Sequence, residues 1–296
     1  MTVSVYLPLL LALPLAFAAP RIAARGTPGP AAWTLAVTAV LAALASTWSL
    51  VLLALTMLDD VPPLSALDDH PTLELPEPVP GPVALIAGLL LIGGGVRLFI
   101  DVRRRVVTNK RLRAIGDPRQ DMVVADWANP MAVAVPGRIR GYGHLLVTTG
   151  ILRLLNPAER QVVFAHERAH LAHRHHRLTA AAAAAAAVNP LLIPVRRAVE
   201  FLVERWADEV AAAEVGNRDL AARTVARAAL AASDAGSNRV LGIDGGVVVR
   251  RVRALSQPRP APLRRRLAGP VLVAAAILGV AAMATEAFLD LAQVWL

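Results

Sequence analysis

The feature that most constrains this chain is the stretch 31–58, which contains no charged side chain. An apolar helix of about 20 residues crosses the hydrocarbon core of a bilayer, so this stretch is long enough for one span. The composition agrees, because 56% of the 296 residues are hydrophobic and the mean hydropathy is +0.52. We therefore expect a mainly α-helical membrane protein rather than a soluble domain.

Three other segments are apolar enough to span the bilayer, at residues 3–19, 82–100 and 267–285. No Lys or Arg precedes the first of them, which favours a span over a cleaved secretory signal. Arg97, about one turn from the end of the third, is expected to snorkel to the interface. Four transmembrane helices are predicted, three of them within residues 1–101, and 267–296 would hold the fourth with a short tail.

Charge sets the expected orientation of these spans. The loop 59–81 is acidic and proline-rich and lacks Lys and Arg, whereas basic residues follow the third span at once and precede the fourth. By the positive-inside rule the basic side is cytoplasmic. Both termini and the loop 59–81 should then be extracytoplasmic, and residues 102–266 should form a cytoplasmic domain.

The composition argues against nucleic acid as a partner and against cross-links or metal sites made by cysteine. The net charge of +9 would suit nucleic-acid binding, but only 4% of the residues are aromatic and the arginines flank apolar segments. We expect the lipid bilayer as a partner and no direct contact with nucleic acid. The chain has no Cys, which excludes disulfides and Cys-ligated metal.

The chemistry of the chain is indicated by an HExxH motif, His166-Glu167-Arg168-Ala169-His170. On a helix, His166 and His170 lie one turn apart on the same face, where two imidazoles can hold one Zn²⁺. Glu167 lies beside them and can accept a proton from the attacking water. The motif therefore predicts the active site of a zinc metallopeptidase.

The residues before the motif predict the helix that this geometry needs. Asn156 can cap the helix, Pro157 suits its first position, and Glu159 can complete a capping box. The helix should run for about twenty residues, with the motif in its middle.

A catalytic zinc site needs a third protein ligand, and the best candidate is Glu204. Asp208 lies four residues further on the same helical face and could accept a hydrogen bond from a ligand imidazole. Glu209 is a rival that points off this face. His176 is another rival by spacing, but the Gly that would make the turn before it is replaced by His173.

The remaining segments of the domain are read from local patterns. His173, His175 and His176 are expected to form a basic helix end near the membrane surface. Residues 178–195 predict a hydrophobic helix, interrupted by prolines, that packs against the spans or dips into the bilayer. Strands are expected at 122–125, 132–135 and 144–149, helices up to 216–217 and over 218–233, and a loop over 234–265. The small sheet could offer an edge to an extended peptide.

The chain resembles the BlaR/MecR family of membrane metallopeptidases. The resemblance rests on AVAVPG at 132–137, VTTG at 147–150, HERAH at 166–170, NPL at 189–191 and ERWAD at 204–208. It implies an α+β gluzincin domain inserted between the third and fourth spans, with His166, His170 and Glu204 as zinc ligands. It also implies that Glu167 is the general base and that Asp208 orients a ligand.

The same resemblance implies a bacterial plasma membrane protein whose substrate is a cytoplasmic protein, typically a BlaI/MecI-type repressor. The best-known members carry a penicillin-binding sensor domain after the last span, and little follows position 285 in this chain. An alternative is a quality-control or prenyl-peptide protease of the HtpX/Ste24 kind. The HtpX kind places membrane segments between the two metal motifs, and Pro190 and Pro194 are expected to oppose a hairpin there. A further alternative is a non-enzymatic receptor or scaffold, against which the intact Glu167 argues.

Overall fold

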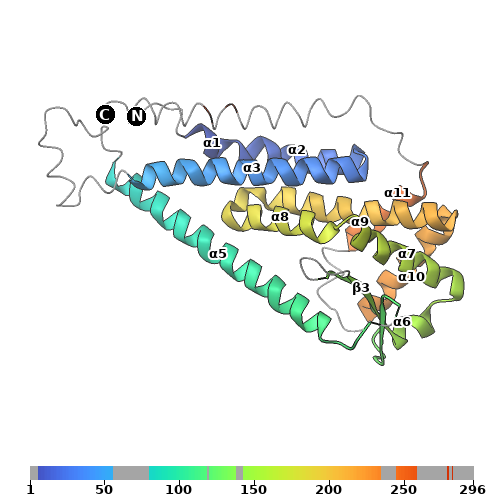
Figure 1. Cartoon of the computed structure of the whole chain (residues 1–296). Helices are drawn as coiled ribbons and strands as arrows, with labels where there is room; N and C mark the ends of the chain where they lie inside the picture. Colours follow the sequence, from blue (N-terminus) through green and yellow to red (C-terminus); the bar gives the residue numbers. More distant parts are fainter. Residues whose placement is uncertain are drawn as a thin grey trace, which may run out of the picture.

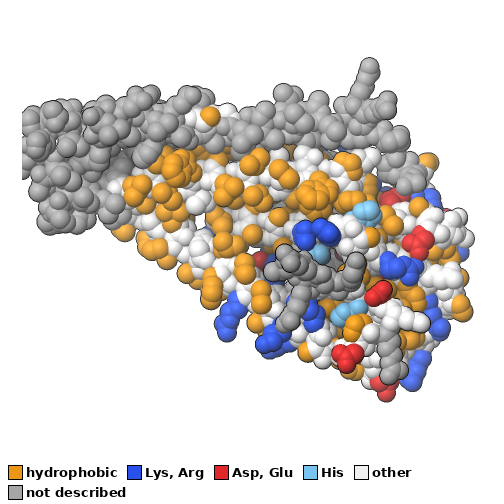
Figure 2. Space-filling model, viewed as in Figure 1, with side chains coloured by type: hydrophobic (Ala, Val, Ile, Leu, Met, Phe, Trp, Pro, Cys, Tyr) orange, Lys and Arg blue, Asp and Glu red, His pale blue; other side chains and the backbone are white. Residues whose placement is uncertain are grey.

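The computed structural model describes residues 6–55, 80–118, 120–137, 143–234 and 245–258, with single residues 279 and 282. Most of the loop 59–81 and nearly all of the predicted span 267–285 lie outside the described residues. The described part is mostly helical, with one small sheet. Its hydrophobic side chains gather over the long helices, and most charged side chains lie toward the other end of the molecule (Figure 2).

Three helical segments of the described residues are long and apolar enough to cross a membrane. The first comprises α1 (Leu7–Leu10) and α2 (Ala12–Arg25), and the second is α3 (Pro28–Leu55). The third, α5 (Gly81–Arg113), continues beyond the predicted span and includes the basic residues that follow it. The antiparallel helices α2 and α3 lie side by side, and α5 diverges from them toward the end of the molecule that holds the small sheet (Figure 1).

A helical hairpin follows the HExxH motif, and its second helix carries Glu204 and Asp208. It consists of α8 (His175–Val188), the 3₁₀ turn η3 (Pro190–Leu192) and α9 (Ile193–Val215). Pro190 and Pro194 were expected to oppose a hairpin of membrane segments here; they do not prevent a helical hairpin, but none of its helices is a candidate span among the described residues. Both prolines lie at the first or second position of a helical segment, where a missing N–H costs nothing.

The hairpin packs along the candidate spans, α8 against α3 and α5 and α9 against α2 and α3 (Figure 1). At its tip, Asn189 Nδ2 donates to Ser46 Oγ of α3 over 3.1 Å. Arg97 Nε donates to the carbonyl of Ala187 over 2.8 Å. It thereby satisfies the carboxyl end of α8. Gly94 gives room for this contact, since a Cβ there would lie 3.1 Å from the carbonyl oxygen of Val188.

The sheet contains the three predicted strands, β1 (Met122–Ala125), β2 (Ala132–Val135) and β3 (His144–Thr148), in the order β1-β3-β2. The central strand β3 pairs in parallel with β1 and antiparallel with β2. All five residues of β3 are buried. Because β2 pairs with β3 alone, it is an edge strand of the sheet. It contacts α7 (Pro157–Ala172), the helix that carries the HExxH motif.

The C-terminal part of the domain closes over α7 and α9. Helix α9 ends at Val215, followed by Gly216 at φ +69°, as the sequence predicts. Helix α10 (Arg218–Asp234) also lies where it was expected. The predicted loop over 234–265 is wrong in part, because α11 (Gly245–Leu255) lies within it. The short helix α6 (Thr149–Leu154) joins the sheet to α7.

Candidate metal centre

Helix α7 begins as its sequence predicts. The Asn156 side chain accepts from the Glu159 N–H over 2.9 Å, and the Glu159 carboxylate accepts from the Asn156 N–H over 2.9 Å. The helix is shorter than expected and ends at Ala172, so the HExxH motif lies in its second half. Arg174 then adopts a left-handed conformation at φ +52°, which separates α7 from α8. This break is why the His-rich stretch does not continue the motif helix.

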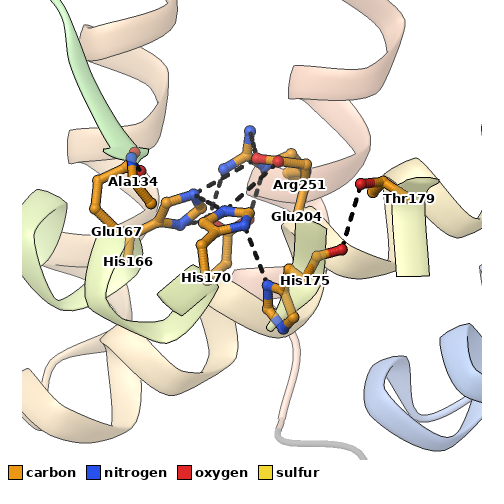
Figure 3. A network of polar contacts seen from close by, with 9 residues as sticks. Ala134, His166, Glu167, His170, His175, Thr179, Glu204 and Arg251 are labelled. Carbon is orange, nitrogen blue, oxygen red and sulfur yellow. Dashed lines mark hydrogen bonds and ion pairs between the residues drawn. The ribbon is translucent and has the colours of Figure 1, made fainter. Parts of the chain in front are cut away.

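Three side chains from α7 and α9 converge on one point (Figure 3). His166 Nε2 lies 3.1 Å from His170 Nε2 and 3.5 Å from Glu204 Oε2, and His170 Nε2 lies 3.6 Å from Glu204 Oε1. Ligand atoms bound about 2.0–2.2 Å from one tetrahedral Zn²⁺ lie about 3.3–3.6 Å from one another. The spacing and the two-His, one-carboxylate donor set therefore fit a zinc ion.

The other ring nitrogen of His166 is fixed by a carboxylate. Its Nδ1 lies 3.0 Å from Asp208 Oδ1, and the Asp208 side chain is only 2% exposed. Arg251 of α11 donates two hydrogen bonds of 2.7 Å to this carboxylate, and its Nη1 lies 3.1 Å from Glu204 Oε2. Arg251 thus connects the carboxylate behind His166 with the third candidate ligand.

The other ring nitrogen of His170 faces a third histidine. His170 Nδ1 lies 3.1 Å from Nδ1 of His175, the first residue of α8. His175 is 1% exposed, and Trp206 of α9 packs against its ring with a centroid distance of 4.7 Å. The expectation that His175 belongs to a basic helix end at the membrane surface is wrong, because the break at Arg174 turns it inward.

Glu167 lies beside the convergent ligands and is held by the edge strand. Its Oε2 accepts from the N–H of Ala134 in β2 over 2.7 Å. A cavity of about 290 Å³ opens in front of this carboxylate. The cavity is lined by residues of β2, α7, α8 and α9, among them Val133, Leu171, Thr179 and Val203, and by Pro136, which follows β2. The arrangement places a carboxylate, a candidate metal centre and a strand edge around one space.

The charges of the site shift the pKa values of its members in the metal-free protein. Burial raises the pKa of Glu167 to about 7. Burial also lowers the pKa of His170 to about 4 and that of His175 to about 3. Burial disfavours the charged form of His166 too, but its hydrogen bonds with Asp208 and Glu204 prevail and raise its pKa to about 10. The Glu204 pKa is lowered, since contact with His166 and the charge of Arg251 outweigh its burial.

Among the described residues, the two rivals of Glu204 for the role of third ligand lie outside the three-residue cluster. Glu209 pairs instead with Arg218, with contacts of 2.6 and 2.9 Å. His176 lines the cavity but lies outside the three-residue cluster. Sequence reasoning missed Arg251, because its segment was read as a loop, and it missed the role of His175. The five-residue step from His170 to His175 carries no helical signal once the helix breaks between them.

The family model of peptidase family M48 matches residues 104–268, which is more than half of the 296-residue chain. No curated protein and no solved structure matches the chain significantly. The matched stretch contains the HExxH motif, Glu204, Asp208 and Arg251, and M48 peptidases are typically zinc-dependent. The match confirms a membrane metallopeptidase family but not the narrower BlaR/MecR resemblance. By this match, the chain belongs to peptidase family M48.

Proposed function

We propose that this chain is a zinc-dependent endopeptidase of the membrane that cleaves a protein on the cytoplasmic side of the bilayer. The observation that carries the proposal is the convergence of His166, His170 and Glu204 within 4.8 Å, with the Glu167 carboxylate next to them. These three side chains are the proposed zinc ligands. Asp208 is proposed to orient His166 through its Nδ1.

Glu167 is the proposed general base. A bound Zn²⁺ supplies a Lewis acid that polarises the scissile carbonyl and makes water more acidic. Burial holds the Glu167 pKa near 7, so its carboxylate can take a proton from the attacking water and return it to the leaving amine. The hydrogen bond from the Ala134 N–H aims this carboxylate into the cavity.

Strand β2 is the proposed support for the substrate backbone. In the antiparallel pair of β2 and β3, Ala134 lies opposite Leu145, yet its N–H donates to Glu167 rather than to β3. The edge of β2 turned away from β3 therefore borders the cavity, and an extended peptide could pair with the positions beside Ala134 as an added strand. This placement would bring a scissile bond beside Glu167.

The substrate class is the finer part of the proposal. The hairpin α8–η3–α9, whose second helix carries Glu204, packs along the candidate spans, although among the described residues neither of its helices is itself a candidate span. The candidate metal centre is thus built against the candidate spans. This observation favours a membrane-protein or prenyl-peptide substrate. Cleavage of a BlaI/MecI-type repressor in signalling is the other candidate, and it rests on the sequence resemblance alone.

The test compares new protein N-termini in cells that carry the wild type or Glu167→Gln. A matched control is Glu214→Gln, which makes the same change at an exposed carboxylate paired with Arg168. We expect cleavage products with the wild type and the control but not with Glu167→Gln, while all three proteins keep their zinc.

The position of the new N-termini names the substrate class. Products from many membrane proteins would support the quality-control reading, and products from one DNA-binding repressor would support the regulatory reading. Products that persist in Glu167→Gln would refute the assignment of the base. Absence of products from metal-loaded wild type under all conditions tested would favour the non-enzymatic scaffold.

A further inference from the structure

The two histidines of the motif differ in what holds their second ring nitrogen. His166 Nδ1 faces the carboxylate of Asp208 at 3.0 Å, which is a common arrangement behind a metal-bound imidazole. His170 Nδ1 instead faces another imidazole, that of His175, at 3.1 Å (Figure 3). The two rings meet edge to face, with centroids 4.8 Å apart and an interplanar angle of 88°. Such a contact has a direction, because one nitrogen must donate and the other accept.

His175 is placed for this contact by the backbone and by packing. Arg174, at φ +52°, ends the course of α7 and turns the chain so that α8 begins with its first side chain behind His170. Trp206 then packs against the His175 ring, at a centroid distance of 4.7 Å. His175 is 1% exposed, so water does not compete for its Nδ1.

Proton accounting fixes the direction of the hydrogen bond. If His170 Nε2 is to offer a lone pair to a metal, the proton of the neutral ring must be on Nδ1. His170 Nδ1 then donates, and His175 Nδ1 must accept. The proton of His175 therefore sits on its Nε2, which is buried and has no hydrogen-bond partner among the described residues. In the opposite arrangement, with His175 as donor, His170 would carry its proton on Nε2, where it blocks the metal.

We propose that His175 is a positioning residue that accepts a hydrogen bond from His170 Nδ1 and so holds His170 in the tautomer that can bind zinc. This inference deepens the proposed function and rests on it. His175 does not touch the reacting atoms or the metal, since its Nδ1 faces the side of His170 turned away from the cluster. It does for His170 what Asp208 does for His166.

The experiment measures zinc affinity by chelator competition in the full-length, detergent-solubilised protein. His175→Leu and His175→Asn are compared, because Leu and Asn have nearly the same shape but only Asn keeps an acceptor close to the position of Nδ1. His173→Leu is the matched control. His173 stacks on the same Trp206 at 4.5 Å and on the His175 ring at 5.7 Å, but among the described residues it has no polar contact with His170. Thermal unfolding of each metal-free variant is recorded alongside.

We expect His175→Leu to weaken zinc binding about 10- to 100-fold, the usual effect of removing such a partner. His175→Asn should recover most of this loss, and His173→Leu should bind zinc like the wild type. Unchanged affinity in His175→Leu, or an equal loss in the Leu and Asn variants, would overturn the inference while leaving the zinc site in place. A wild-type chain that binds no zinc would overturn the proposed function, and the inference with it.

Discussion

Replacement of Asp208 by Asn should weaken zinc binding by a predictable amount. The carboxylate accepts from His166 Nδ1 at 3.0 Å and takes two hydrogen bonds of 2.7 Å from Arg251. An amide keeps one acceptor oxygen, but its NH₂ group faces a donor and its negative charge is gone. Loss of the partner behind a ligand imidazole typically costs about 10- to 100-fold in metal affinity, or about 1.4–2.7 kcal/mol.

The same change should lower stability, because Asp208 is 2% exposed and Arg251 loses its main counter-charge. Breaking a buried ion pair costs about 3–5 kcal/mol, and we expect the lower end because Arg251 keeps its contact with Glu204 at 3.1 Å. The two effects must be separated, since a protein that is less stable can also appear to bind less metal.

Glu209→Gln separates them. Glu209 is the next residue of α9 and forms a bidentate pair with Arg218 at 2.6 and 2.9 Å, but that pair does not touch a motif histidine. Chelator competition on the full-length protein should show weaker zinc binding in Asp208→Asn alone, whereas thermal unfolding without metal should shift in both variants. If the two variants bind zinc equally well, Asp208 does not orient His166 and the reasoning fails.

Three further predictions follow from the same geometry. Glu204→Ala should sharply reduce zinc content measured by elemental analysis, and unchanged content would move the third ligand elsewhere. Zinc affinity should rise about tenfold per pH unit between pH 6 and 8. The reason is that the metal must displace one proton from His166, whose pKa lies near 10 without metal. A zinc affinity that does not change with pH would contradict this. Arg97→Leu should lower the unfolding temperature of the solubilised protein, because it removes the 2.8 Å hydrogen bond from Arg97 Nε to the Ala187 carbonyl. The control Arg104→Leu, in the basic part of α5, should leave the unfolding temperature nearly unchanged. Equal shifts in these two variants would show that this contact does not hold the hairpin.

Much of the site could be predicted because its signals are local. The capping residues Asn156 and Glu159 define the start of α7, and helical periodicity then places His166 and His170 on one face. The i, i+4 relation of Glu204 and Asp208 survives in α9 for the same reason. The three strands were found because short apolar runs are bounded by turn residues.

The parts that could not be predicted depend on a single backbone angle or on tertiary contact. A left-handed Arg174 decides whether His175 faces solvent or His170, and no local pattern marks an arginine for that conformation. Arg251 reaches Asp208 across 43 residues of sequence, so its partner appears only in the folded chain. The prolines at 190 and 194 were read as breaks in the chain's path, whereas in the structure they begin helical segments.

The contact between α9 and the turn that joins α2 to α3 bears on how separable the catalytic part of this chain is. Arg205 donates to the carbonyl of Ala23 over 2.9 Å, and Trp206 packs so close to Gly29 that a Cβ there would lie 3.1 Å from the indole. Both residues directly follow Glu204 in sequence. A fragment that begins at residue 104 would lose this support and expose the buried face that α8 and α9 share with α2 and α3. The N-terminal helices thus support the helix that carries Glu204, and a larger side chain at Gly29 would press on Trp206 of that helix, although Gly29 lies outside the family-matched residues 104–268.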